Sequence, residues 1–271
     1  MSSTAFEGLL WSETNVRTLI PATICMVVFA LFLRLLIGSK GIRTRNIPFI
    51  LIGASIVVLE FVKQYRDLVP GPYSQYSLPL HFSSTFLLLI PLAHFTRGSL
   101  AETMRPVAGI ASGMTTIGML TVPMTVFGDA ANGFFRDFGS FHTIFYHYAI
   151  LFYFILFVAL EMHEPNWRKD AKKIFILITA YTVVAAPLAN LLGVNFMSFL
   201  YSSIPPVEAI RLQLREAIGA VPAQLLYILF MYVGIIMSCT LSTLLFRGLD
   251  ALVRKCPKAI RIAGSLPGIA R

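Results

Sequence analysis

Apolar residues fill this chain in seven long runs, and each run is separated from the next by a short polar stretch. A helix needs roughly 20 mainly apolar residues to cross the hydrocarbon core of a bilayer. The pattern therefore predicts an all-α, polytopic membrane protein with seven transmembrane helices, built as one domain over residues 1–271. The predicted spans cover residues 19–38, 47–69, 79–95, 106–128, 141–162, 174–193 and 222–246, and a basic tail follows over 247–271.

Basic residues alternate between the loops. The first, third and fifth loops and the tail hold most of the Lys and Arg, whereas the other loops hold few. Cytoplasmic loops carry an excess of Lys and Arg, so we expect the N-terminus outside and the C-terminus in the cytoplasm. Arg34 lies near the inner end of the first span, and we expect its side chain to snorkel into the first loop.

Composition supports a membrane protein. Hydrophobic residues make up 56% of the chain and charged residues 13%, against about 25% charged residues in a soluble domain. The net charge of +9 is explained by the loops, so it does not indicate a nucleic-acid partner. The three cysteines have neither metal nor disulfide spacing.

Two further segments have a readable pattern. In the fourth run, Gly109 and Gly113 form a small-xxx-small pair that favours close helix packing. In the sixth run, Ala185-Ala186-Pro187 predicts a kink. After it, residues 210–218 place Arg211, Arg215 and Glu216 among apolar residues, which predicts a short amphipathic helix on the outer surface.

The polar residues inside the spans converge once the topology is applied. His81 begins the third span at the outer face, His147 lies roughly 9 Å deep and Glu60 roughly 13 Å deep at 1.5 Å per residue. Asn195 follows the outer end of the sixth span, and we expect no comparable set in the inner half. An ionisable residue within the membrane is a functional-site hypothesis by default.

Each of these residues also has a structural interpretation. Glu60 can pair with Lys63 one helical turn later, and His142 is expected to be hydrated at the interface. His147 can be hydrogen-bonded within the bundle. The hydroxyls of residues 83–85 can bond to preceding backbone carbonyls.

Helix geometry sorts the hydroxyls. Residues three and four apart share a face, so Ser84 and Thr85 are expected beneath His81, while Ser83 points about 200° away. His147 is then the candidate base for Ser83. A zinc site formed by Glu60 and the histidines is a weaker alternative, because no local spacing supports it. We expect no metal and no cofactor.

Three motifs make the chain resemble the YwaF family of bacterial integral membrane proteins. Residues 77–83 are similar to its Leu-Pro-Leu-His-x-Cys element, and His147 matches a family histidine. Residues 193–196 and 219–222 resemble its Gly-x-Asn-Tyr and Gly-x-x-Pro segments. The resemblance implies a bacterial plasma membrane and, more remotely, relatives that transfer or hydrolyse fatty acyl groups. Ser83 stands where that family usually has cysteine.

Two functional hypotheses follow, with membrane lipids as the expected partners and the oligomeric state left open. The first is a lipid-directed acyl transferase or hydrolase with His147 as base, Ser83 (or Ser84 or Thr85) as nucleophile, and His81 or Asn195 as oxyanion donor. The second is a non-catalytic protein that binds or transports a lipid or small molecule. In both, the outer pocket is completed by Glu60, Tyr148 and Arg66. In the first hypothesis Arg66 holds a phosphate headgroup, and the alternative for it is a solvated interfacial arginine.

Overall fold

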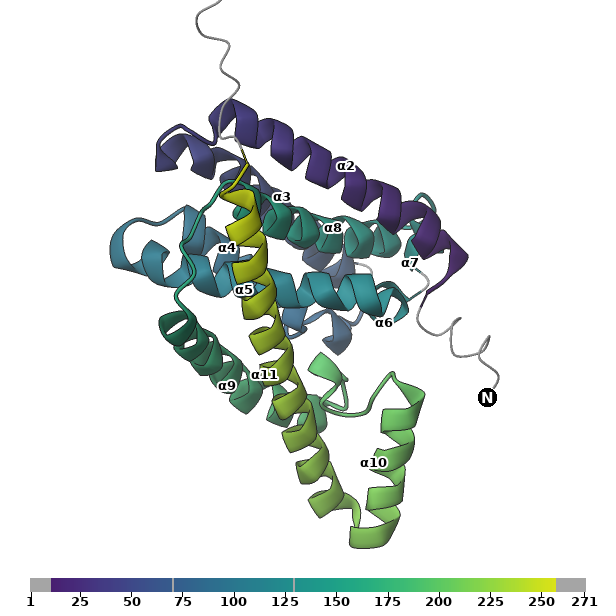
Figure 1. The fold of residues 1–271 in the computed structure, drawn as a ribbon. Helices are drawn as coiled ribbons and strands as arrows, with labels where there is room; N and C mark the ends of the chain where they lie inside the picture. The colour runs from purple at the N-terminus through teal and green to yellow at the C-terminus, as the bar shows by residue number, and fades with distance from the viewer. Residues whose placement is uncertain (1–10, 70, 129, 257–271) are drawn as a thin grey trace, which may run out of the picture.

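The computed structural model describes residues 11–69, 71–128 and 130–256, and every regular element within them is helical (Figure 1). Seven of the helices in these described ranges build the bundle. They are α2 (Glu13–Ile37), α3 (Ile42–Leu68), α4 (Phe86–His94), α5 (Gly98–Thr121), α8 (Phe138–Ala159), α9 (Trp167–Leu192) and α11 (Ala220–Val253). Shorter elements connect them: η1 (Gln75–Ser77), η2 (Phe82–Thr85), α6 (Pro123–Phe127), α7 (Ala130–Gly133), η3 (Phe196–Ser198) and α10 (Pro205–Ile218).

All seven predicted apolar runs lie on helices, and five of these helices are long and apolar enough to cross a membrane: α2, α3, α8, α9 and α11. The third run is shorter than expected, because residues 79–81 precede the helix and η2 with α4 extends only from Phe82 to His94. At 1.5 Å per residue this segment is about 20 Å long, less than the roughly 30 Å hydrocarbon core. That α4 and α5 also cross the membrane, which would give seven spans, stays a prediction.

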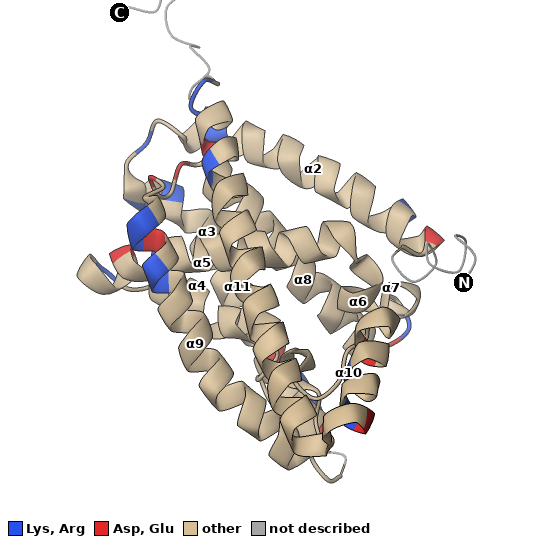
Figure 2. Ribbon diagram, turned by 60° about the horizontal axis from the view of Figure 1, so that its bottom comes forward, with Lys and Arg blue, Asp and Glu red and all other residues tan. Residues whose placement is uncertain are grey.

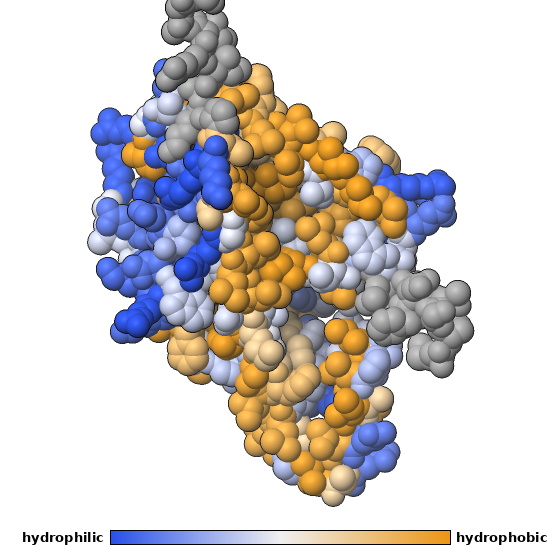
Figure 3. All heavy atoms as spheres, viewed as in Figure 1, coloured by the Kyte–Doolittle hydropathy of each residue, from blue (hydrophilic) through white to orange (hydrophobic). Residues whose placement is uncertain are grey.

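The outer surface of the bundle is apolar. Large side chains such as Phe61 (72% exposed), Leu88 (68%) and Leu191 (80%) face outward, and Figure 3 shows extended hydrophobic surface over the helices. Soluble monomers rarely expose contiguous apolar patches of this kind. Lipid tails are the natural solvent for this surface, and the protein is a multi-pass membrane protein.

Helix α5 lies at the centre and packs against α4, α8, α9 and α11. Its middle, from Pro106 to Gly113, is buried throughout. A Cβ atom at Gly109 would overlap the ring of Phe157 on α8, and one at Gly113 would overlap Ser242 on α11. The predicted small-residue pair thus lets two neighbouring helices approach closely.

The loops that the charge pattern assigned to one side of the membrane gather at one end of the bundle. Arg45 at the start of α3 donates to the Leu160 carbonyl after α8 (2.7 Å), and Asn46 donates to the His94 carbonyl at the end of α4 (2.7 Å). Figure 2 shows most of the Lys and Arg residues at this end. Helices that cross the membrane in alternating directions place every second loop on the same side, as this grouping requires. Which side of the membrane that is stays a prediction.

Arg34 is buried instead of snorkelling, so that prediction was wrong. Only 2% of the residue is exposed. Its guanidinium donates to the carbonyls of Ala159 (2.6 Å) and Val253 (2.8 Å) and pairs with Glu161 at 2.8 Å. Carbonyls at helix C-termini have no intrahelical partner and carry partial negative charge. The ends of α8 and α11 therefore supply a site for the cation inside the protein.

The amphipathic segment after α9 is a helix, and it begins earlier than predicted, at Pro205. Helix α11 continues beyond the predicted end of its span at residue 246 and ends at Val253. The tail cations Lys258, Arg261 and Arg271 lie outside the described residues.

Replacing Gly109 with alanine tests the close packing of α5. We expect Gly109→Ala to lower the free energy of unfolding by about 1–3 kcal/mol, because the added methyl group overpacks the contact with Phe157. Gly118→Ala is the matched control on the same helix, since its Cβ would meet only Val126 at 3.9 Å. It should stabilise by up to about 1 kcal/mol through helix propensity. Thermal unfolding in mild detergent measures both, and equal shifts would contradict the packing argument.

The Arg34 site can be compared with an exposed ion pair on the same helix. Arg34→Ala should cost about 3–5 kcal/mol, because it removes a buried cation from two helix-end carbonyls and from Glu161, although Glu161 also pairs with Arg254 at 3.8 Å. Arg17→Ala should cost about 0.5 kcal/mol or less, since Arg17 and its partner Glu13 are 75% and 76% exposed. Chemical denaturation of the two variants in micelles provides the comparison. A loss for Arg34→Ala no larger than that for Arg17→Ala would refute a structural role for this arginine.

Candidate functional site

Glu60 accepts hydrogen bonds from three side chains in the half of the bundle opposite the basic end. The carboxylate bonds to Lys63 (3.3 Å) and Gln64 (2.6 Å) on its own helix, α3, and to Nε2 of His142 on α8 (3.0 Å). The Lys63 pair that the sequence allowed is therefore formed. His142 was expected to be hydrated, but only 9% of it is exposed, because Glu60 holds it inside the protein.

The Glu60 network continues into the segment before α4. Gln64 also donates to the Ser77 carbonyl (2.7 Å) and accepts from the Tyr73 hydroxyl (2.5 Å), and the Ser77 hydroxyl donates to Asp67 (2.5 Å). These bonds fix the position of the chain that leads to His81. They were not predicted from the sequence, because residue spacing does not reveal how a loop folds back on its helix.

His81 precedes the first helical turn instead of lying inside it. Its backbone is extended (φ −78°, ψ 152°), and residues 82–85 form the 3-10 turn η2. The predicted α-helical face that would place Ser84 and Thr85 beneath His81 therefore does not form. The His81 ring packs edge-on against Phe196 at 5.4 Å, and Nε2 donates to the Tyr76 carbonyl at 3.3 Å.

The three hydroxyls of η2 differ in their bonding. Thr85 donates to the Phe82 carbonyl (2.7 Å), which is the ordinary arrangement for a hydroxyl in a membrane helix. The half-buried side chains of Ser83 and Ser84 form no hydrogen bond with any described residue. Polar groups inside a membrane protein normally find partners. These two hydroxyls are therefore the ones available to a ligand.

His147 has one ring nitrogen engaged. Nδ1 lies 2.8 Å from the Thr143 carbonyl one turn earlier on α8. A carbonyl can only accept, so Nδ1 carries the proton in the neutral ring and Nε2 keeps its lone pair. Within the described part of the chain, Nε2 has no hydrogen-bond partner. This tautomer is the one that a general base requires.

The segment around Ser83 and helix α8 are joined through tyrosines. The Tyr146 hydroxyl, beside His147 in sequence, donates to the Ser83 carbonyl at 3.3 Å, and Tyr181 of α9 donates to the His81 carbonyl at 3.0 Å. His81 and His142 are also close enough to act electrostatically on His147. The structure thus brings Glu60, His81, Ser83 and His147 to one region, although no hydrogen bond joins His147 to a hydroxyl of the described residues.

Three other predicted site residues lie away from this cluster. Asn195 closes the loop after α9 by bonding to the backbone of Leu200 and Tyr201, so its amide is already used. The Arg66 guanidinium lies over the Phe138 ring at 4.6 Å. Tyr148 faces a groove on another side of α8.

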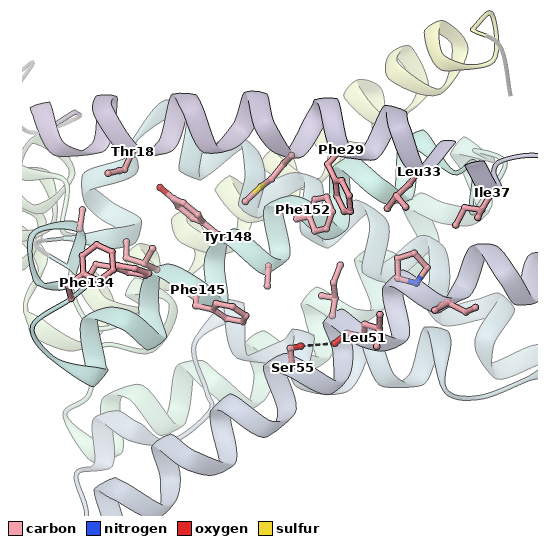
Figure 4. Close-up of a pocket in the computed structure, with 18 of the residues that line it drawn as sticks. Thr18, Phe29, Leu33, Ile37, Leu51, Ser55, Phe134, Phe145, Tyr148 and Phe152 are labelled. Carbon is pink, nitrogen blue, oxygen red and sulfur yellow. Dashed lines mark hydrogen bonds between the residues drawn. The ribbon is translucent and has the colours of Figure 1, made fainter. Parts of the chain in front are cut away.

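That groove lies between α2 and α3, with α8 as its floor (Figure 4). Both helices pack on α8, yet they share few contacts with each other. The space between them has a volume of about 1150 Å³ and is lined mainly by apolar side chains such as Phe29, Leu51 and Phe152. Its end near α7 carries Asn132 and Arg136. The shape and chemistry suit a long apolar chain with a polar head.

The inner half also holds a polar set, contrary to expectation. His94 is 2% exposed and lies between the Asn46 side chain (2.5 Å from Nδ1) and the Tyr153 hydroxyl (2.8 Å from Nε2), stacked on Phe49. Both ring nitrogens are satisfied and the site is closed. Its geometry indicates a structural network that ties α3, α4 and α8 together.

Metal ligands do not cluster in the part of the chain that the structure covers. Within residues 11–69, 71–128 and 130–256, no group of three or more His, Cys, Asp or Glu side chains is placed to hold a metal ion. The zinc alternative for Glu60 and the histidines therefore has no geometric support.

A protein-family model decides the family: the model of the TMEM164 family matches residues 10–244. The chain belongs to the TMEM164 family. Comparison with curated proteins finds no match, and comparison with solved structures finds none either. The TMEM164 match covers every candidate site residue described above.

The resemblance to the YwaF family was wrong. The three motifs that resembled the YwaF family have local structural roles in this TMEM164-family chain. Matches to such short motifs therefore did not identify the family. Residues 77–83 lead into the turn η2, Asn195 closes a loop, and Gly219 adopts a positive φ of 90° between α10 and α11. Such positions recur wherever membrane helices start or turn. The bacterial plasma membrane was inferred from that resemblance and stays a prediction.

Removing the shared acceptor tests the Glu60 network. Glu60→Ala should cost about 3–5 kcal/mol, because it leaves the buried His142 without its acceptor and removes one of the two acceptors of the Gln64 amide. Lys63→Met removes only a partner that is 24% exposed, and it should cost about 1 kcal/mol or less. Unfolding in detergent measures both losses. If Lys63→Met costs as much as Glu60→Ala, the network depends on the lysine and not on the histidine.

Proposed function

We propose that this TMEM164-family protein acts on the acyl esters of membrane lipids, as an acyl transferase or hydrolase. The observation that carries the proposal is the state of His147: its Nδ1 donates to the Thr143 carbonyl, and its Nε2 has no hydrogen-bond partner among the described residues. A basic nitrogen without a partner is costly within a membrane protein. It is therefore expected to serve a reaction or a ligand.

Ser83 is the proposed nucleophile. Its hydroxyl is half-buried and unpaired among the described residues, and its carbonyl accepts from Tyr146, the residue next to His147. The base and this hydroxyl are not hydrogen-bonded to each other, so the reaction requires rotation of the Ser83 side chain toward α8. Apo structures often have such contacts open until substrate binds.

The proposed reaction follows ordinary serine chemistry. Nε2 of His147 takes the hydroxyl proton while the Ser83 oxygen forms a bond to the ester carbonyl carbon. The bond to the lipid alkoxide then breaks, and His147 returns the proton to that leaving group. Water or a second lipid alcohol removes the acyl group from Ser83 by the same steps in reverse order.

The sequence assigned His81 or Asn195 as oxyanion donor, and both side chains already donate to backbone carbonyls of the described residues. Nε2 of His81 is used on the Tyr76 carbonyl, and the Asn195 amide is used on Tyr201. We propose Tyr146 instead, because its hydroxyl lies beside Ser83 and its 3.3 Å bond to the Ser83 carbonyl is long for an O–H donor, so this donor can be transferred to the oxyanion. Glu60 acts indirectly, by holding α3 against His142 one turn before Tyr146 on α8.

The apolar groove between α2 and α3 supports a lipid substrate. Ile144, Tyr148 and Phe152 line the groove from α8, the helix that also carries His147. The same groove favours the second candidate, a protein that binds a lipid without chemistry. In that case the groove would bind lipid whether or not His147 and Ser83 are present.

Substitution of the base and each hydroxyl separates the two candidates. With a labelled phospholipid in nanodiscs, His147→Ala should lower the rate of acyl release or transfer about 100-fold or more, the usual contribution of a general base. Ser83→Ala should lower the rate at least as much. Thr85→Val is the matched control, because the Thr85 hydroxyl is bonded to the Phe82 carbonyl.

A fluorophosphonate probe provides a second measurement, because it labels activated serines. We expect mass spectrometry to find the label on Ser83 in the wild-type protein and to find no label in His147→Ala. Labelling of Ser84 alone would assign the nucleophile to Ser84 instead of Ser83. Wild-type protein with neither acyl chemistry nor label, but with bound lipid, would overturn the enzyme and leave the binding protein.

A further inference from the structure

A second cavity, of about 940 Å³, lies between α9, α10 and α11, apart from the His147 cluster. One part is apolar and is lined by Val183, Pro187, Leu225 and Ile228. The polar residues of the lining are Asn190 on α9, Gln224 on α11, Arg211 and Arg215 on α10, and Tyr201 before α10, together with Thr182. Figure 1 shows α10 lying alongside the first half of α11, so that this helical hairpin forms one wall.

The exposed surface of α10 is mixed, because apolar residues are exposed there together with Gln213, Arg215 and Glu216. The side chain of Arg211 is only 13% exposed, while Ile210 is 57% and Ile218 is 44% exposed. Apolar residues on the outside suit contact with lipid. Arg211 is therefore turned into the cavity, and the exposed Arg215 lines its edge, where it is accessible to what enters between α9 and α11.

The charges in the cavity leave about one positive charge uncompensated. Arg211 forms an ion pair with Glu208 and also contacts the Gln224 oxygen at 3.4 Å. The hydrogen bond from Arg211 lowers the pKa of Glu208, so this pair is ionised and neutral overall at neutral pH. Arg215 lines the same cavity and has no ion pair with a described residue.

We propose that this cavity binds one anionic membrane lipid, with its phosphodiester held by Arg215 and its acyl chain along Val183, Leu225 and Ile228. An arginine fork matches the paired oxygens of a phosphate. A zwitterionic lipid presents the same phosphate but adds a cation, which Arg215 and Arg211 repel. The site is therefore selective for a net negative headgroup. This inference does not depend on the acyl chemistry proposed for His147.

The test uses a tryptophan placed in the cavity. Leu225 is 63% exposed and lines the site, so Leu225→Trp adds a fluorophore with little packing cost. The full chain is reconstituted in phosphatidylcholine vesicles containing a minor fraction of brominated phosphatidylglycerol or brominated phosphatidylcholine. We expect the anionic lipid to quench the added tryptophan with about ten-fold higher apparent affinity, the size expected for one charge-assisted hydrogen bond.

Arg215→Gln in the Leu225→Trp background should abolish this preference. Arg136→Gln, which removes the cation at the groove between α2 and α3, should leave it unchanged. Millimolar inorganic phosphate should not relieve the quenching, because it has no acyl chain. Equal quenching by both lipids, a preference that survives Arg215→Gln, or displacement by phosphate would each overturn the proposal. If Leu225→Trp does not fold, Val183→Trp on the opposite wall serves the same measurement.

Discussion

The organising constraint in this protein is that polar groups within the bundle have no water to bond to. Each must find a partner inside the protein, since an unsatisfied group in hydrocarbon costs several kcal/mol. Arg34 binds the helix-end carbonyls of Ala159 and Val253, and Glu60 accepts from three side chains. These networks join helices that are distant in sequence. The fold is consequently held together at both ends of the bundle, with the closely packed α5 between them.

The same constraint distinguishes structural from functional polar residues. His94 has a partner on each ring nitrogen and lies in a closed core, so we interpret it as a structural residue. One ring nitrogen of His147 has a hydrogen-bond partner, and the hydroxyls of Ser83 and Ser84 have none within the described residues. All of these side chains are polar and lie within or beside apolar segments. Only the second set leaves bonding capacity for another molecule.

Hydrophobic runs predicted where the helices lie, because length and polarity determine what can enter a bilayer. They did not predict that α11 extends to Val253, whose carbonyl binds Arg34, or that the third span begins with the 3-10 turn η2, since both are set by local contacts. The cross-helix pairs of Glu60 with His142 and of His94 with Asn46 join residues far apart in the chain, so no spacing rule reveals them. Short motifs misassigned the family, because residues that start helices are shared between unrelated membrane proteins.

The separation of α2 from α3 has a consequence for biogenesis. Helix α2 packs on α8 and α7 and makes few contacts with α3, so about a hundred residues must be synthesised before its docking surface exists. Until then α2 must remain in the bilayer without this surface, and its most apolar stretch is more hydrophobic than that of the other four long apolar helices. Arg34 enters the membrane before Glu161 has been translated. During that interval its side chain must reach the interface, and assembly of the bundle later draws it inside.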